Sequence, residues 1–171
     1  MNLLVFSDSH GRGSKILEAF ERQTKKPDAV IFLGDGLSDL YYCDFGDVPT
    51  FSVCGNCDML AILGNGVAKR EIVIALGGKR ILLTHGDMYG VKGGLARIVA
   101  TANERDIDIV LFGHTHRPLE KYIPEGESDF GIYIKKPIYL FNPGSVGEYP
   151  SSFGCIEIKD DGSVALSHGE I

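Results

Sequence analysis

Residues 3–11 read Leu3-Leu4-Val5-Phe6-Ser7-Asp8-Ser9-His10-Gly11, an apolar run that stops abruptly at a polar loop ending in glycine. Similar apolar runs occupy residues 29–33 and 107–112. Because their apolar residues are nearly continuous and do not alternate with polar ones, these runs are typical of central sheet strands that helices cover. They predict the α/β fold class.

A βαβ unit and a hairpin are predicted next along the chain. Residues 14–26 carry apolar side chains at helical spacing, which predicts a crossover helix capped by Ser14. Residues 71–76 and 80–84 flank Gly77-Gly78-Lys79, and paired glycines favour a tight antiparallel turn. A further helix is expected at residues 94–105, and further strands at 132–134, 138–141, 153–158 and 164–167. This mixture predicts two packed sheets with helices outside them, and it leaves the strand order open.

Length and composition are those of one soluble domain, expected to span residues 1–171. The formal net charge of −6 opposes non-specific attraction to nucleic acids and anionic membranes. No apolar run approaches the ~20 residues that cross a bilayer, and the first residues lack the charged start of a signal peptide. These features predict a cytoplasmic protein whose four cysteines stay reduced.

Metal-type side chains follow five of the predicted strands, at the point where each strand ends. The carboxyl ends of strands in α/β sheets share one edge, where functional crevices form, so these side chains are expected to meet there. They are Asp8, His10, Asp35, Asn56, His85, His114 and His116. The strongest single motif is Gly113-His114-Thr115-His116, because two imidazoles beside a strand end are costly to bury as mere packing.

The two carboxylates, four imidazoles and one amide of this set exceed the needs of one tetrahedral site. They suit two cations that share a bridging carboxylate, a layout that stabilises both the attacking and the leaving oxygen of an in-line phosphoryl displacement. Four imidazoles exclude a site for magnesium alone and favour divalent transition metals.

In chain order, the motifs Asp-x-His, Gly-Asp, Gly-Asn, Thr-His-Gly and Gly-His-Thr-His resemble those of the calcineurin-like metallophosphoesterases. Asn142-Pro143-Gly144-Ser145-Val146 adds a match, and Gly55-Asn56-Cys57-Asp58 is similar to the small stand-alone prokaryotic phosphodiesterases. The resemblance implies a four-layer αββα sandwich of two mixed β-sheets flanked by helices. It also implies one ion held by Asp8, His10, Asp35 and His116, and a second held by Asp35, Asn56, His85 and His114.

The function implied by this resemblance is phosphodiester hydrolysis through attack by a metal-bound hydroxide, with these seven ligands as the catalytic residues. Manganese is expected at both positions, with iron, cobalt, nickel and zinc as alternatives. The expected substrate is a small phosphoester or a nucleotide-type molecule. A homo-oligomer is left open, and no membrane or non-specific nucleic-acid partner is expected.

Two positions depart from the family pattern. Cys57 stands where many members carry a histidine that protonates the leaving group, and a neutral thiol is a weak donor, so a preference for phenolate or phosphoanhydride leaving groups is expected. Asp87 stands where close relatives often carry a second histidine, which adds negative charge near the site.

Other polar residues near the motifs are interpreted as supporting groups. Asp39 and Asp58 are expected to orient loops or ligating groups. Arg12 and Arg117 adjoin ligand motifs, but exposed arginines are common, and neither is included in the predicted site. His168 has no partner motif and is expected at the surface.

Two other functions compete with the enzyme hypothesis. Cys54 and Cys57 form a Cys-x-x-Cys pair, which favours a redox or zinc site, but no second pair accompanies it and the histidines stay unexplained. The other is a non-catalytic metal-binding scaffold or protein-interaction subunit of the same fold. A scaffold is expected to lose ligands, whereas this chain has a residue at all seven positions.

Overall fold

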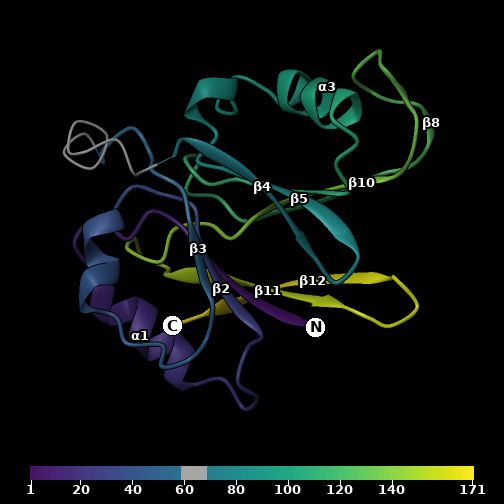
Figure 1. Ribbon diagram of the computed structural model, residues 1–171. Helices are drawn as coiled ribbons and strands as arrows, with labels where there is room; N and C mark the ends of the chain where they lie inside the picture. The colour runs from purple at the N-terminus through teal and green to yellow at the C-terminus, as the bar shows by residue number, and fades with distance from the viewer. Residues whose placement is uncertain (59–68) are drawn as a thin grey trace.

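The computed structural model describes residues 1–58 and 69–171 and contains two five-stranded sheets packed face to face, with a helix outside each (Figure 1). The helical segments are α1 (Gly13–Glu21), η1 (Leu37–Tyr42), η2 (Asp87–Tyr89) and α3 (Ala96–Glu104). This arrangement is the αββα sandwich of two mixed sheets that the sequence predicts.

The first sheet has the strand order β12-β11-β1-β2-β3. Its strands are β1 (Asn2–Phe6), β2 (Ala29–Phe32), β3 (Thr50–Ser52), β11 (Ser152–Ile158) and β12 (Val164–Glu170). The strands β1, β2 and β3 run parallel, and β11 and β12 add an antiparallel edge. The predicted βαβ unit is therefore confirmed, and its strands end at the same edge of the sheet.

The second sheet has the order β4-β5-β6-β10-β7. Its strands are β4 (Glu71–Leu76), β5 (Lys79–Thr84), β6 (Ile109–Leu111), β7 (Leu119–Ile123) and β10 (Ile138–Asn142), and a separate small ribbon pairs β8 (Gly126–Glu127) with β9 (Tyr133–Ile134). The strands β5, β6 and β10 are parallel, while β4 and β7 pair antiparallel at the edges. The predicted hairpin of β4 and β5 is confirmed, with positive φ at Gly77 and Gly78.

The core is divided into three layers because side chains alternate across each strand. In β1, Leu3 and Val5 face the other sheet, whereas Leu4 and Phe6 face α1. In the second sheet, Leu82 of β5 faces α3. The central strands thus bury both faces, which explains why their sequences are continuously apolar.

Two local predictions are wrong. Helix α1 begins at Gly13 and ends at Glu21, and the N-cap position is Arg12, without a side-chain hydrogen bond, so Ser14 lies inside the first turn. Pro27 disfavours helical backbone at the residue before it, and the chain must already be extended to enter β2. No strand is predicted over β7, because its residues alternate between partly buried and exposed up to the buried Ile123 and contain no apolar run.

Candidate metal centre

The backbone turns sharply at the ends of the strands that carry the predicted ligands. Among the described non-glycine residues, positive φ occurs at Asp8, His10, Asp35, His114 and His116, and otherwise at Asp106 alone. This region of backbone space is unfavourable for residues with a Cβ and is concentrated at functional sites. The strain is therefore located where the sequence predicts chemistry.

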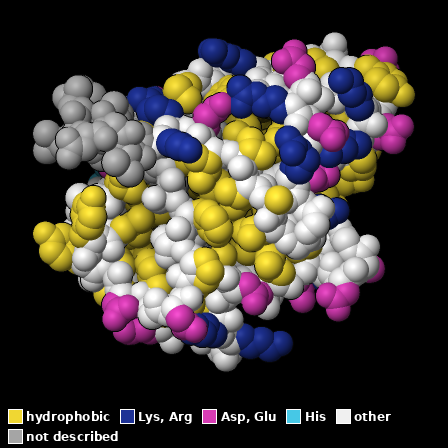
Figure 2. All heavy atoms as spheres, in the orientation of Figure 1, with side chains coloured by type: hydrophobic (Ala, Val, Ile, Leu, Met, Phe, Trp, Pro, Cys, Tyr) yellow, Lys and Arg dark blue, Asp and Glu magenta, His cyan; other side chains and the backbone are white. Residues whose placement is uncertain are grey.

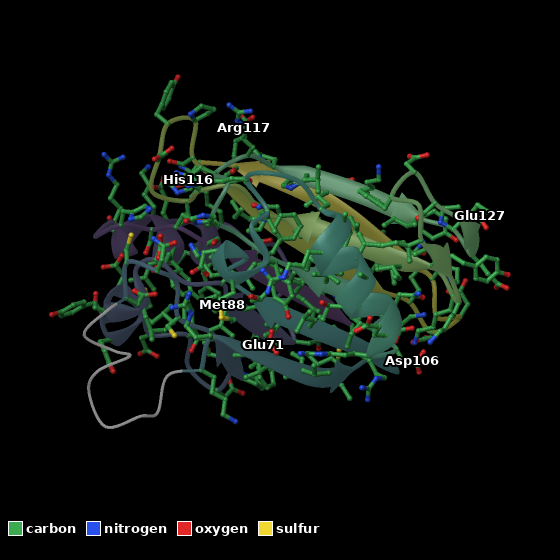
Figure 3. The ribbon with its side chains drawn as sticks, turned by 90° about the horizontal axis from the view of Figure 1, so that it is seen from above. Glu71, Met88, Asp106, His116, Arg117 and Glu127 are labelled. Carbon is green, nitrogen blue, oxygen red and sulfur yellow. The ribbon has the colours of Figure 1, made fainter. Side chains whose placement is uncertain are left out.

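One group of donors surrounds Asp8, which is fully buried at the end of β1. Its Oδ1 lies 3.1 Å from His116 Nε2, 3.8 Å from His10 Nε2 and 3.9 Å from His85 Nε2. The two more exposed imidazoles also face each other, with 3.4 Å between His10 Nε2 and His116 Nε2. Figure 3 places His116 near Arg117 at one end of the molecule. Asp8, His10 and His116 form a set of donors that could hold one metal ion.

A second group surrounds Asp35, at the end of β2. Its Oδ2 lies 3.3 Å from His85 Nε2, which is in turn 3.2 Å from His114 Nδ1. Burial alone would raise the pKa of Asp35, but hydrogen bonds from His85 and the backbone N–H of Cys57 outweigh it and hold that pKa far below its usual range. Asp35, His85 and His114 could hold a second ion. Asp35 also forms a group with His10 and Cys57, so it lies between the two sets.

Hydrogen bonds orient two of the imidazoles toward the centre. His85 Nδ1 lies 2.9 Å from the carbonyl oxygen of Leu33, and His116 Nδ1 lies 2.7 Å from Glu148 Oε1. With Nδ1–H donating to these oxygens, the Nε2 lone pair of each ring is directed at the carboxylates. The sequence does not predict Glu148 as part of the site, because it lies more than 30 residues from His116 in the chain and follows no ligand motif.

The buried Oδ1 of Asp8 indicates that a cation belongs here. Among side-chain atoms of residues 1–58 and 69–171, Asp8 Oδ1 and Arg70 Nε alone are buried without a hydrogen-bond partner. The other oxygen of Asp8 is satisfied by Ser7 Oγ at 2.5 Å and by the backbone N–H of His114 at 3.1 Å. An unpaired buried carboxylate oxygen among imidazole nitrogens costs free energy unless a metal ion binds it. The donors present therefore fit the ions that the motifs imply.

The loops that carry the ligands are braced by two acidic residues. Asp58 accepts hydrogen bonds at 2.8–2.9 Å from the backbone N–H groups of Asp35, Gly36, Leu37 and Gly55. Asp39 Oδ2 accepts from Ser9 Oγ at 2.5 Å and from the N–H of Gly11 at 2.9 Å. Both carboxylates thus hold backbone groups of the loops that carry the predicted ligands.

The segment at residues 142–146, which carries the Asn-Pro-Gly-Ser-Val motif, also holds the site together through hydrogen bonds. Asn142 Nδ2 donates to the carbonyl oxygen of Gly113 at 2.8 Å, and Ser145 Oγ donates to that of Asp8 at 2.8 Å. Arg12 Nη1 donates to the carbonyl oxygen of Gly147. These contacts join three loops that are far apart in the chain.

Asn56 and Cys57 lie at the exposed mouth of the centre. The backbone N–H of Cys57 donates to Asp35 Oδ1 at 2.7 Å, and Asn56 Nδ2 donates to Cys57 Sγ at 3.3 Å. Burial and the neighbouring carboxylate of Asp35 raise the pKa of the Cys57 thiol to about 11.

The structure changes the interpretation of two further residues. Asp87 forms an ion pair with Arg70, so its charge is compensated. His168 is wrongly predicted to lie at the surface: its ring stacks on Phe141, its Nε2 lies 2.7 Å from the carbonyl oxygen of Asn142, and its Nδ1 lies 2.9 Å from Glu120. The reason is the pairing of β11 with β12, which turns His168 toward the body of the molecule.

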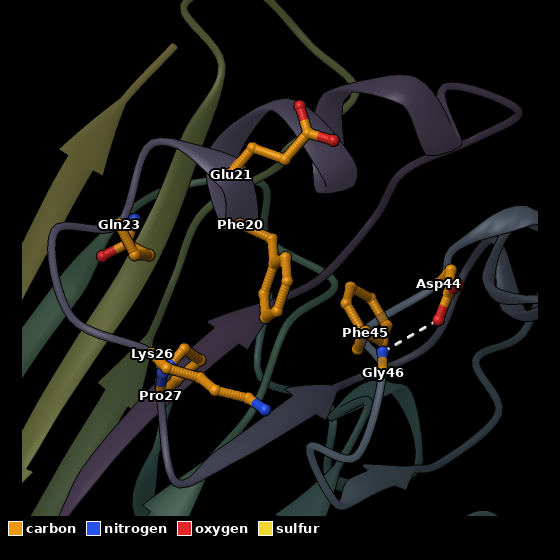
Figure 4. Close-up of a pocket in the computed structure, with 8 residues that line it drawn as sticks. All are labelled: Phe20, Glu21, Gln23, Lys26, Pro27, Asp44, Phe45 and Gly46. Atoms are coloured by element: carbon orange, nitrogen blue, oxygen red, sulfur yellow. Dashed lines mark hydrogen bonds between the residues drawn. The ribbon is translucent and has the colours of Figure 1, made fainter.

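Two further features of the described part of the chain are its mixed surface charge and a hollow at the opposite edge of the first sheet. Figure 2 shows acidic and basic side chains interspersed on one face. A hollow of about 440 Å³ lies beside the end of α1, where Phe20 meets Phe45 edge to face and Asp44 accepts a hydrogen bond from Gly46 (Figure 4). It is at the amino end of β2, opposite the edge that carries the ligands.

No helix within residues 1–58 and 69–171 is long and apolar enough to cross a bilayer.

Comparison with known proteins decides the family. Residues 1–161 match the model of the calcineurin-like phosphoesterase superfamily domain. The chain belongs to that superfamily. It is 34% identical over 146 residues to the "Probable metallophosphoesterase YsnB" of Bacillus subtilis (strain 168), covering 85% of this chain and 75% of that protein. The protein is accordingly a metallophosphoesterase by family.

Two solved structures of this superfamily fold have the same architecture. A predicted phosphoesterase from Streptococcus pneumoniae TIGR4 aligns with a TM-score of 0.68 and 24% identity, over 99% of this chain and 97% of that one. Vps29 of Entamoeba histolytica, solved with Zn²⁺, aligns with a TM-score of 0.69 and 23% identity, over 99% of both chains. At these identities the likeness establishes the fold alone.

Proposed function

We propose that this calcineurin-like phosphoesterase is a phosphodiesterase that uses two divalent metal ions. The observation that carries the proposal is the unpaired, buried Oδ1 of Asp8, which faces three imidazole nitrogens next to a second carboxylate–imidazole set. Two adjoining sets of donors on one sheet edge are suited to a substrate with a bridging, anionic group such as a phosphoester.

The seven predicted ligands would divide between the two ions. Asp8, His10 and His116 would hold the first, and His85, His114 and Asn56 the second. Asp35 would bridge them, because it is grouped with His10 on one side and with His85 and His114 on the other. When bound, such ions supply positive charge that polarises a phosphoryl group and acidifies water. We propose manganese because the resemblance to this family implies it, and the imidazole and carboxylate donors would also accept iron, cobalt, nickel or zinc.

The residues of the chain itself shape the reaction around that centre. Glu148 and the carbonyl of Leu33 hold the rings of His116 and His85 in one orientation. Cys57, at the mouth, would face the leaving group as a weak hydrogen-bond donor. The proposed substrates are therefore small cytoplasmic phosphodiesters or nucleotide-type molecules whose leaving groups need little protonation.

Hydrolysis of an aryl phosphodiester with added manganese tests the proposal. Asp35→Asn should lower kcat/KM by at least about 100-fold, because it removes charge from the bridge between both sets of donors. Titration calorimetry should show weakened manganese binding in the same variant. The control, Asp129→Asn, changes an exposed carboxylate outside the site and should match the wild type.

The outcomes separate the two candidate functions. A wild-type protein that binds manganese and hydrolyses no phosphoester would support the non-catalytic scaffold. Loss of folding in Asp35→Asn, detected by circular dichroism, would shift the test to His114→Asn, which lies on the other loop and is less buried.

A further inference from the structure

A hollow of about 530 Å³ is lined in part by chain neighbours of the predicted ligands His114 and His116. It is lined by residues from two loops: Val91, Lys92 and Leu95 follow β5 and η2, and Phe112, Thr115 and Arg117 follow β6. Thr115 stands between the predicted ligands His114 and His116, and Arg117 comes directly after them. A molecule in this hollow would therefore touch the loop that carries two of the imidazoles.

The floor of the hollow is apolar and continuous with the strand end that carries His85. Val91 and Phe112 are buried, and Leu95 is partly buried. Gly86 follows His85, and a Cβ placed there would lie 2.9 Å from Val91 Cγ2 and 3.5 Å from Phe112 Cβ. The volume and the apolar floor match the size and character of sites for small organic groups.

The rim of the hollow carries two exposed cations without ion-pair partners. Neither Lys92 nor Arg117 forms a salt bridge with any acidic residue, all of which lie within the described ranges 1–58 and 69–171. Figure 3 shows Arg117 beside His116. Both positive charges thus lie unpaired at a hollow whose wall includes Thr115, between His114 and His116.

The carboxylates of the surrounding loops do not neutralise these cations. Asp87 forms an ion pair with Arg70, whereas Glu120 and Glu148 lie against the imidazoles of His168 and His116. Neither Lys92 nor Arg117 is paired with a carboxylate, so the rim offers two unpaired positive charges in a molecule whose overall charge is −6. An anionic group would be attracted to this place in particular.

We propose that Lys92 and Arg117 bind a second phosphate of the substrate. The substrate class is then a phosphodiester joined to an aromatic or nucleoside group that carries a further phosphate monoester. The diester lies at the metal centre, the apolar group lies over Val91, Leu95 and Phe112, and the dianionic monoester meets the two cations. This inference rests on the proposed function and names its specificity.

A matched pair of substrates tests the inference. Thymidine 5′-(4-nitrophenyl phosphate) and its 3′-phosphorylated form share the same scissile diester and release the same nitrophenolate. For the wild type with manganese, the 3′-phosphorylated form should have a kcat/KM at least about tenfold higher, since a charge-assisted hydrogen bond contributes on that order. In the double variant Lys92→Met/Arg117→Met this ratio should fall close to one.

The control variant is Lys25→Met. Lys25 is also an exposed lysine, but it precedes β2 and therefore lies at the opposite edge of the sheet from the ligands. It should keep the wild-type ratio. Equal ratios in the wild type and the double variant would overturn the inference while leaving phosphodiester hydrolysis intact.

A binding measurement decides the case in which the wild type hydrolyses neither substrate, which would contradict the proposed function. Thymidine 3′,5′-bisphosphate is titrated into each protein with manganese by calorimetry. Affinity that falls at least about tenfold in the double variant and not in Lys25→Met supports the phosphate site. Equal affinity in all three proteins refutes it.

Discussion

A single carboxylate, Asp58, connects two of the ligand loops without belonging to either set of donors. Its four backbone hydrogen bonds join the loop after β2 to the loop after β3. Hydrogen bonds to a charged acceptor are stronger than neutral ones, and an unpaired buried N–H is costly. Asp58 therefore fixes the position of Asp35 relative to Asn56 and Cys57.

The thiol of Cys57 leads to a prediction about leaving groups. Replacing it by Cys57→His provides a donor that can protonate an alkoxide, so kcat for alkyl phosphodiesters should rise by about 10-fold or more, with a smaller change for nitrophenyl esters. Steady-state kinetics on both ester types measures this. Cys54→Ala, which alters the other, buried cysteine of the pair, is the control. Equal acceleration of alkyl and aryl esters would exclude a leaving-group role for this position.

The strand ends depend on glycines that allow close approach of neighbouring loops. Gly34, after β2, has φ of +95°, and a Cβ there would lie 2.3 Å from the backbone nitrogen of Gly55. Gly78, in the β4–β5 turn, has φ of +75° and open space around it. The two positions share the backbone strain and differ in the steric clash.

Gly34→Ala should therefore lower the free energy of unfolding by roughly 3 kcal/mol or more, whereas Gly78→Ala should cost about 1–2 kcal/mol from the positive φ alone. Urea unfolding of both variants measures the difference. Similar losses would show that the loops after β2 and β3 adjust without strain.

A polar link between β4, η2 and the end of α3 predicts a pH effect. Tyr89 Oη donates to Glu71, which also pairs with Arg105 at 2.6 Å. Burial and the neighbouring Glu71 raise the pKa of Tyr89 to about 12. Because the folded value lies above the unfolded value of about 10, this phenol contributes stability that is complete below pH ~10 and is lost as the pH rises toward 12.

The wild type should thus lose roughly 2 kcal/mol more than Tyr89→Phe between about pH 8 and about pH 12. Unfolding by urea at the two pH values measures this. Parallel loss in both proteins would mean that other groups cause the alkaline effect.

For the whole molecule, metal binding should be linked to stability. Both sets of donors join loops from the two sheets, so an ion would bind the folded state and not the unfolded chain. Manganese at about 100 times its Kd should add about 2.7 kcal/mol and raise Tm by roughly 5–10 °C. Differential scanning calorimetry with manganese, and then with excess chelator, measures the change. A Tm that does not change when manganese is added would contradict the proposed centre. In Asp8→Asn, most of the manganese-dependent increase in Tm should be lost.

The central strands and the predicted ligands could be identified from local sequence. Continuous apolar runs identify β1, β2 and β6 because both of their faces are buried, and the polar motifs after them mark the sheet edge. The fold class and the family follow from these motifs. The partly buried β7 and the ends of α1 could not be predicted, because weak periodicity and a nearby proline leave the local pattern ambiguous.

The partners of the ligands were decided by tertiary contacts. Sequence identified His116 but not its acceptor Glu148, and it identified Asp87 but not the compensating Arg70. The sequence predicts an ordinary surface arginine at position 117, whereas the fold places Arg117 with Lys92 beside the same hollow. Hydrogen bonds and electrostatic attraction depend on distance in space, and the order of the strands in the sheets sets those distances. Because strand order leaves no periodic pattern in the sequence, these contacts could not be predicted from it.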